Sequence, residues 1–281
     1  MASTINTNMS SLTAQRALSS TNGSLSTSMQ RLSTGLRINS AKDDSAGLAI
    51  ATRMTSQVRG MAVASRNAND AISMAQTAEG ALGKIGESLQ RMRELAVQSS
   101  NGTNSTTDRA NLDQEFKALS SEVTRVIGGT KFNGTSLLNS ATAISFQVGA
   151  DNNGTTDAIS VSLSNIGSGT GMTAILNSTA ATGSISTSAT ALTAMSNLDL
   201  AIDEITTARS GLGSVQNRFE SVVANLGTTS ENLQAAKGRI VDADFAVETS
   251  NMSRAQVLQQ AGNAMLAQAN QAPQQVMSLL R

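Results

Sequence analysis

The fold of this chain is decided by one long stretch, Ser45 to Gln98, which reads SAGLAIATRMTSQVRGMAVASRNANDAISMAQTAEGALGKIGESLQRMRELAVQ. Every seventh residue from Met54 to Ala96 is apolar, and a second apolar row with the same spacing runs from Ala64 to Met92. Positions spaced by three and four residues share one face of an α-helix, so the two rows predict a narrow coiled-coil seam. A helix of about 50 residues is about 75 Å long, so we expect an elongated rod.

A matching partner for this seam lies near the other end of the chain. Apolar residues recur every seven positions from Leu198 to Ile240, and Met195 and Ile202 belong to a second row. Two seams of this kind bury each other when their helices lie side by side. We therefore expect a mainly α fold of long antiparallel helices, which periodicity alone cannot distinguish from an ordinary coiled coil.

A third helix is predicted between these two. Ser105-Thr106-Thr107-Asp108 has the pattern of a capping box, and Gly128-Gly129 marks the end of the helix. Its apolar stripe includes Leu112 and Phe116, and a short preceding loop makes it fold back on the long helix. The residues expected in the core of the rod are Met54, Met61, Leu82, Leu89, Leu112, Phe116, Leu198, Ile205, Leu212, Phe219 and Leu226.

The middle of the chain has a different pattern. AISFQV (143–148) and AISVSL (158–163) read as two short strands, and the turn-rich segment between them predicts a β-hairpin. The segment 167–190 is a low-complexity mixture of Gly, Ser, Thr and Ala. Such a composition supplies little core, so we expect an exposed, variable tip there.

Both ends of the chain read as amphipathic helices. The first covers Met1–Ile38, and the last follows a break at 237–239, with Asp242 or Asp244 as its cap. Because the two ends share this character, we expect them to pair, and to order only when a partner covers them. Their apolar stripe consists of Ile5, Met9, Leu12, Leu18, Leu25, Leu32, Leu258, Met265, Val276 and Leu279.

These patterns divide the chain into five parts. The terminal segments are 1–44 and 239–281, and the rod is formed by 45–138 and 191–238. The remaining part, 139–190, holds the hairpin and the tip.

The amino-acid composition argues against most catalytic and metal-binding functions. The 281 residues include no His, Cys, Trp or Tyr, only 14% are charged, and the formal net charge is zero. The usual general bases, nucleophiles and His/Cys metal sites are therefore missing, and we expect no enzyme and no cofactor. A neutral chain gives no electrostatic case for nucleic acid, and no apolar run is long enough for membrane insertion. The amino terminus lacks the features of a cleaved signal peptide, which taken alone predicts a cytoplasmic protein.

Long segments at both ends closely resemble bacterial flagellin. At the amino end these are INTNMSSLTAQRAL (5–18), RLSTGLRINSAKDDSAGLAI (31–50) and LQRMRELAVQSSNGTNS (89–105), followed by TKFNG (130–134). At the carboxyl end they are RIVDADFAVETSNMSRAQVLQQAG (239–262) and LAQANQAPQQVMSLLR (266–281). The resemblance covers roughly the first 140 and last 90 residues, and identifies a short form with almost no outer-domain insert.

The resemblance implies a self-assembling structural subunit. Flagellins polymerise into the flagellar filament used for motility, with their paired terminal helices forming its inner tube. They leave the cell unfolded through the flagellar type III apparatus, so the resemblance predicts a secreted, extracellular protein and overrides the cytoplasmic expectation. It also implies an export chaperone bound around 251–281, and contacts with the filament cap and hook-filament junction proteins.

A receptor motif is also implied by the resemblance. In flagellins that Toll-like receptor 5 recognises, the long helix carries QRxREL and the next helix carries a Glu. Gln90, Arg91, Glu94 and Leu95 match the motif, and Glu115 falls at the Glu position. Arg91 and Glu94 are also compatible with filament contacts or a solvated face. The alternative function for the whole chain is a hook-filament junction protein or a secreted coiled-coil adaptor.

Overall fold

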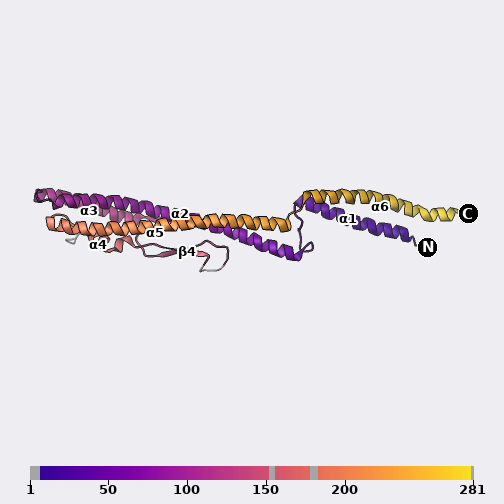
Figure 1. The fold of residues 1–281 in the computed structure, drawn as a ribbon, viewed down its shortest axis with the longest axis horizontal. Coiled ribbons are helices and arrows are strands. Elements are labelled where there is room, and N and C mark those ends of the chain that lie inside the picture. Colours follow the sequence, from indigo (N-terminus) through magenta and orange to yellow (C-terminus); the bar gives the residue numbers. More distant parts are fainter. Residues whose placement is uncertain (1–6, 152–155, 178–182, 280–281) are drawn as a thin grey trace. The chain divides into compact units, whose positions relative to one another are not determined.

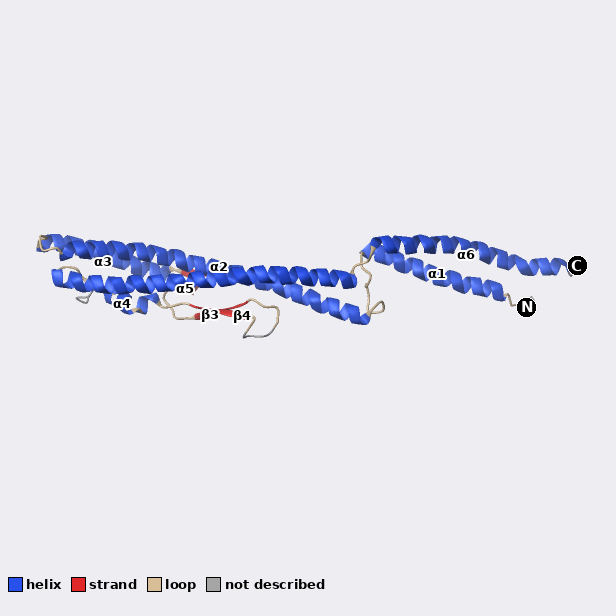
Figure 2. Cartoon of the chain, viewed as in Figure 1, coloured by secondary structure: helices blue, strands red, loops and turns tan. Residues whose placement is uncertain are grey.

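The computed structural model of the protein describes residues 7–151, 156–177 and 183–279, with side chains described as far as residue 271. The helices are α1 (Met9–Thr34), α2 (Ser45–Ser100), α3 (Thr106–Gly129), α4 (Thr170–Leu176), α5 (Ser188–Val241) and α6 (Phe245–Leu279), with a 3-10 turn η1 (Ile166–Ser168). The strands are β1 (Lys131–Phe132), β2 (Thr135–Ser136), β3 (Ala143–Gln147) and β4 (Ala158–Ser162). The mainly α fold with a small β-hairpin is thereby confirmed (Figure 2).

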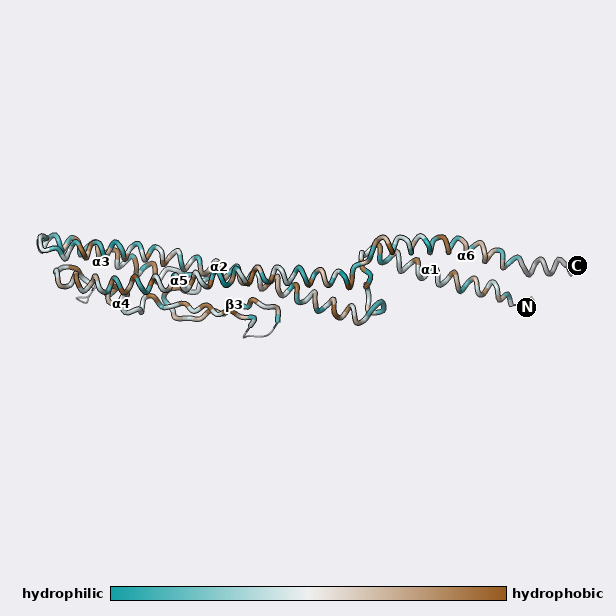
Figure 3. Tube along the Cα trace, in the orientation of Figure 1, coloured by the Kyte–Doolittle hydropathy of each residue, from teal (hydrophilic) through white to brown (hydrophobic). Residues whose placement is uncertain are grey.

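The chain divides into two compact units. Unit 1 contains residues 1–56 and 231–281, and unit 2 contains residues 57–230. The boundaries fall inside α2 and α5, so both long helices contribute to both units. Apolar and polar residues alternate along the helices of each unit, as a buried seam requires (Figure 3).

In unit 2, α2 and α5 run antiparallel, and α3 folds back along α2 (Figure 1). The Ser188 hydroxyl donates to the carbonyl of Ser100 at 3.0 Å, and Arg93 pairs with Asp199 at 2.6 Å, so side-chain contacts join the end of α2 to the start of α5. The predicted capping box opens α3, where the Ser105 hydroxyl accepts a hydrogen bond from the amide of Asp108.

The predicted core residues occupy two environments. Leu82, Leu89, Phe116, Leu198, Ile205, Leu212 and Phe219 are buried in the main hydrophobic cluster of unit 2. Leu112 is half-buried and packs against this cluster, whereas Met54, Met61 and Leu226 are half-buried in other parts of α2 and α5. The seam of α2 contains many alanines with almost no exposed surface, among them Ala68, Ala71, Ala75 and Ala78. Small side chains let the helix backbones approach closely.

The β-hairpin forms where the sequence predicts it. β3 and β4 are antiparallel, with Ala143 opposite Ser162 and Gln147 opposite Ala158. Phe146 of β3 meets Phe219 of α5 edge-on, with ring centroids 5.8 Å apart, and this contact holds the hairpin against the helix. A second hairpin, β1–β2, was not predicted, and it turns at Asn133 and Gly134, both of which have positive φ.

The central segment corrects one prediction. Instead of an exposed tip without core residues, it contains α4, and Met172, Ile175 and Ile185 have no exposed surface. Few apolar residues occur in the described part of this segment, but Met172, Ile175 and Ile185 belong to the main hydrophobic cluster of unit 2. The low average hydropathy of this segment therefore led to the wrong prediction that it adds little to the core.

In unit 1, α1 and α6 lie side by side (Figure 1). The segments next to them pair through backbone hydrogen bonds, among them those from Arg37 to the carbonyl of Val241 at 2.7 Å and from Ala243 to the carbonyl of Gly35 at 2.9 Å. Pairing of the terminal helices is as predicted. Two boundaries were wrong, because α1 ends at Thr34 and α5 continues through Gly238 to Val241. Asp244 is the cap of α6, since its carboxylate accepts from the amides of residues 246 and 247.

Candidate assembly surface

The interface between α1 and α6 combines half-buried apolar side chains with specific polar contacts. The Ser11 hydroxyl donates to the amide oxygen of Asn270 at 2.8 Å, and Gln259 donates to Asn22 at 2.8 Å. Near the base of the pair, a guanidinium nitrogen of Arg31 lies 3.8 Å from the carboxylate of Glu248. Gly262 allows close contact, because a Cβ there would lie 3.3 Å from the Leu18 side chain.

The predicted apolar stripe is divided between this interface and the surface. Leu18, Leu25 and Leu32 of α1 are half-buried. Met9 and Leu12 are 60% and 41% exposed. On α6, Leu258 and Met265 are 53% and 64% exposed and point away from the interface. Ile5 lies outside the described residues, as do the side chains of Val276 and Leu279.

Further apolar side chains on the same helices are exposed, although they are not among the residues predicted for the assembly stripe. Met29 of α1 is 54% exposed, and Phe245, Val247 and Val257 of α6 are 54–64% exposed. Phe245, Val247 and Val257 lie outside the seven-residue rows from which the stripe was predicted, whereas Met29 belongs to a second row with Leu36. Together with Met9, Leu12, Leu258 and Met265 they form what we call the outward apolar surface of unit 1.

In unit 2, Arg91 joins α2 to α3 at the predicted receptor motif. Its guanidinium donates to Glu94 at 2.9 Å and to Glu115 at 2.9 and 3.1 Å. The hydrogen bonds from Arg91 to Glu94, then those to Glu115, raise the pKa of Arg91 above its ordinary value. Gln90 and all three charged residues are exposed. Leu95 is only 1% exposed and packs in the core, so its assignment to a surface motif was wrong.

A buried carboxylate that sequence reasoning missed lies on α3. Asp113 accepts hydrogen bonds from the Ile185 amide at 2.8 Å and the Ser184 hydroxyl at 2.9 Å, and pairs with Lys117 at 2.7 Å. Burial opposes ionisation of this carboxyl, but the contacts with Lys117, Ile185 and Ser184 outweigh it and hold the pKa of Asp113 below its ordinary value. No local motif marks Asp113, because its partners are distant in sequence.

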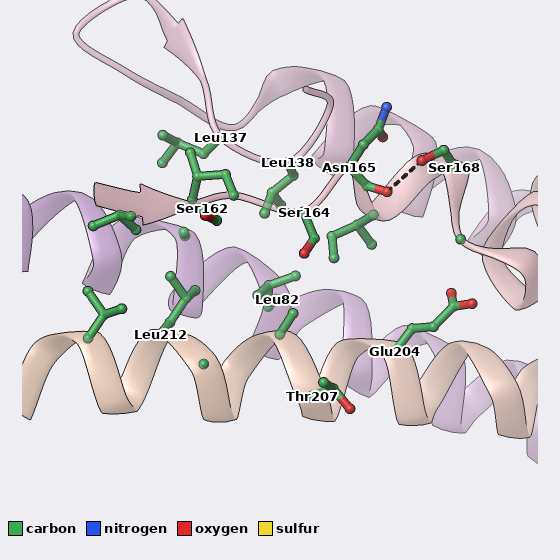
Figure 4. Close-up of a pocket in the computed structure, with 18 of the residues that line it drawn as sticks. Leu82, Leu137, Leu138, Ser162, Ser164, Asn165, Ser168, Glu204, Thr207 and Leu212 are labelled. Carbon is green, nitrogen blue, oxygen red and sulfur yellow. Dashed lines mark hydrogen bonds between the residues drawn. The ribbon is translucent and has the colours of Figure 1, made fainter. Parts of the chain in front are cut away.

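A cavity of about 870 Å³ lies in unit 2 between α5 and the segment that follows β4 (Figure 4). Leu82, Leu138 and Leu212 supply apolar walls. Glu204 rises from α5 toward the segment that carries Ser168, and its carboxylate accepts the Gly171 amide at 3.1 Å. This hydrogen bond fixes the start of α4 on α5. The Glu204 carboxylate at the cavity therefore has a structural role.

Two other kinds of site are absent from the described residues. Within the described ranges, no three His, Cys, Asp or Glu side chains gather as metal ligands would. None of the helices in the described part of the chain combines the length and the hydropathy needed to cross a membrane.

Comparison with known proteins identifies the family. The model of the bacterial flagellin N-terminal helical region matches residues 5–143, and that of the C-terminal helical region matches residues 195–280. The chain is 45% identical to a flagellin of Xenorhabdus nematophila over all of both chains, and 44% identical to one of Halalkalibacterium halodurans over 99% of each. A crystal structure of Bacillus cereus flagellin superposes with a TM-score of 0.50 at 33% identity, covering 61% of this chain and 94% of that one. Taken with the paired terminal helices and the helical unit between them, these matches show that the chain belongs to the bacterial flagellins and is a structural subunit of the flagellar filament.

Proposed function

We propose that the chain polymerises through the outward apolar surface of unit 1, with segments 1–44 and 239–281 forming the inner tube of the filament. The observation that carries this proposal is the exposure of Leu258 and Met265, at 53% and 64%. Fully burying a side chain of this size contributes about 1.5–3 kcal/mol. Several such residues on two helices favour association when neighbouring copies cover them, and the gain offsets the ordering of the helices.

The proposal is tested by removing apolar area without altering the contacts between α1 and α6. The double variant Leu258→Ser, Met265→Ser is expected to stay monomeric when filament seeds are added, in negative-stain microscopy and sedimentation. A matched control replaces two exposed amides of the same helix, Gln256→Ser and Gln260→Ser, and is expected to grow filaments. Equal growth of both variants would contradict the assignment of this surface to assembly.

The proposed role as a filament subunit also implies binding partners and a location for the protein. The role is non-catalytic, and assembly takes place outside the cell after export through the flagellar type III apparatus. The export chaperone holds residues 251–281 before export, so it covers part of the outward apolar surface and keeps it from associating early. Filament cap and hook-filament junction proteins contact the ends of the polymer. The high identity to flagellins over the full length supports a filament subunit over a junction protein or adaptor.

A second candidate function is recognition by Toll-like receptor 5, with Gln90, Arg91, Glu94 and Glu115 as contacts. The observation that favours it is that Arg91, Glu94 and Glu115 meet on one exposed surface of α2 and α3. Charged groups held in a fixed geometry provide a specific polar contact for a partner. We predict that Arg91→Ala weakens binding of monomeric protein to the receptor ectodomain. The control is Lys84→Ala, another exposed cation of α2, which pairs with Glu87. Equal binding by both variants would count against the receptor site.

A further inference from the structure

Methionine is the one side chain of this protein that mild oxidants attack readily. The sequence contains 12 methionines and no Cys, Trp, Tyr or His. Peroxides convert the thioether of methionine to a sulfoxide, and a flexible apolar side chain thereby becomes a polar one. The positions of the methionines therefore decide what such an oxidant does to the protein.

The methionines of the two units differ in exposure. Those of unit 2 are buried or half-buried, namely Met61, Met74, Met92, Met172 and Met195. Among the described side chains, the exposed methionines are Met9, Met29 and Met265, at 60%, 54% and 64%. The other described methionines of unit 1, Met54 and Met252, are half-buried. The exposed thioethers therefore lie on the terminal helices α1 and α6.

The three exposed methionines belong to the outward apolar surface, which contacts within a single chain leave uncovered. The terminal helices are expected to order only when neighbouring copies cover them. A segment that is not ordered exposes its thioethers at least as fully as the paired helices do. A free subunit therefore offers Met9, Met29 and Met265 to solvent whether or not α1 and α6 are paired.

We propose that Met9, Met29 and Met265 are sites of reversible oxidation, and that their sulfoxides prevent a free subunit from joining the filament. The inference rests on the proposed assembly role of the outward apolar surface. The oxidant is a peroxide. A sulfur lone pair attacks one peroxide oxygen, and the S–O bond forms as the O–O bond breaks. The proton on that oxygen passes to the departing hydroxide and gives water, so sulfur loses an electron pair and the peroxide gains it.

A sulfoxide opposes assembly because its oxygen is a hydrogen-bond acceptor on a surface that association removes from water. Burial of such an acceptor without a donor is unfavourable. Once copies have associated, the same sulfur atoms are covered and should react more slowly. Oxidation thus acts on free subunits and spares those already assembled.

The first test treats the free, full-length chain with hydrogen peroxide, removes the peroxide and adds filament seeds. We expect growth to slow by about tenfold. The triple variant Met9→Leu, Met29→Leu, Met265→Leu keeps apolar side chains of similar volume without the thioethers, so treatment should leave its growth unchanged. The control is Met61→Leu, Met195→Leu in unit 2, which should stay as sensitive as the natural chain. Equal sensitivity of the triple variant and the control overturns the proposal.

A second measurement needs no variant. The natural chain is partly oxidised and grown on seeds, and the sulfoxide content of each methionine is compared by mass spectrometry between filaments and unpolymerised protein. We expect sulfoxides at residues 9, 29 and 265 to be enriched in the unpolymerised fraction, and those at 61 and 195 to be shared equally. Equal sharing at all five positions overturns the proposal.

Reversibility has its own test. Methionine sulfoxide reductases, one for each sulfoxide epimer, should restore the growth of the oxidised chain. A loss of growth that the reductases do not reverse overturns the proposed reversible site.

The results also distinguish this inference from the assembly proposal. Normal growth of the Leu258→Ser, Met265→Ser variant overturns the assembly proposal itself. Lost growth of that variant, together with normal growth of the oxidised natural chain, overturns the oxidation sites alone.

Discussion

The carboxylate of Asp113 accepts a hydrogen bond at 2.8 Å from the backbone amide of Ile185, 72 residues further along the chain. The carbonyl of the same Ile185 accepts the Ser99 hydroxyl at 2.6 Å, and the isoleucine side chain is fully buried. Both backbone polar groups of Ile185 are thereby satisfied inside unit 2. This arrangement fixes the end of the central segment to α2 and α3 immediately before α5 begins.

Removing the Asp113 carboxylate should destabilise unit 2. Asp113→Ala leaves the buried amide of Ile185 without an acceptor, which typically costs about 1–3 kcal/mol. The free energy of unfolding from urea titration of the monomer measures this loss. Glu122→Ala on the same helix, at an exposed ion pair with Arg125, should change it much less, because solvent screens an exposed pair. Equal effects of the two variants would show that the Ile185 contact carries little energy.

The same carboxylate should make stability depend on pH. The contacts of Asp113 lower its pKa in the folded protein, so the unfolded chain, with an ordinary pKa of about 3.9, binds its proton more readily. The stabilisation is therefore fully present above about pH 4 and is lost as the pH falls through the folded pKa. Asp113→Asn cannot ionise, so its stability deficit should be largest at neutral pH and shrink in acid. A deficit independent of pH would contradict this linkage.

Glycine at position 171 sets how closely α4 approaches α5. A Cβ at Gly171 would lie 2.5 Å from the backbone nitrogen of Ala201 and 2.7 Å from the carbonyl oxygen of Asn197. Because backbone atoms of a long helix cannot move aside, Gly171→Ala should destabilise unit 2 by about 1–3 kcal/mol. Gly211→Ala in α5 meets no neighbouring atom within 4 Å and should stabilise by about 0.5–1 kcal/mol. Thermal unfolding of the two variants should therefore shift in opposite directions, and a shared direction would refute the packing argument.

Deleting residues 251–281 should abolish polymerisation while leaving unit 2 folded. The deletion removes most of α6, including Leu258 and Met265, and leaves α1 without its partner. The hydrophobic cluster of unit 2 is formed by residues 68–219 and keeps all its contacts. Circular dichroism should show a cooperative helical transition, and electron microscopy with seeds should show no filaments. Filaments grown from the truncated chain would contradict the prediction.

Much of the helical framework could be predicted from the sequence. The repeats of α2 and α5, the capping box at Ser105 and the alternation in β3 and β4 each depend on local periodicity or turn chemistry. Local signals of this kind act within a few residues and remain when the chain folds. The similar character of the two ends also predicted that α1 and α6 pair.

Only the tertiary structure decided which surface each residue reaches. Leu95 satisfies a surface motif in the sequence but is buried, and Leu258 belongs to an apolar stripe but is exposed. Ile185 lies in a low-complexity segment and is nonetheless part of the core. Periodicity shows that a helix has an apolar face, but not which neighbour covers it. That depends on contacts between distant residues, such as Asp113 with Ile185 and Arg31 with Glu248, which exist only once the helices are packed.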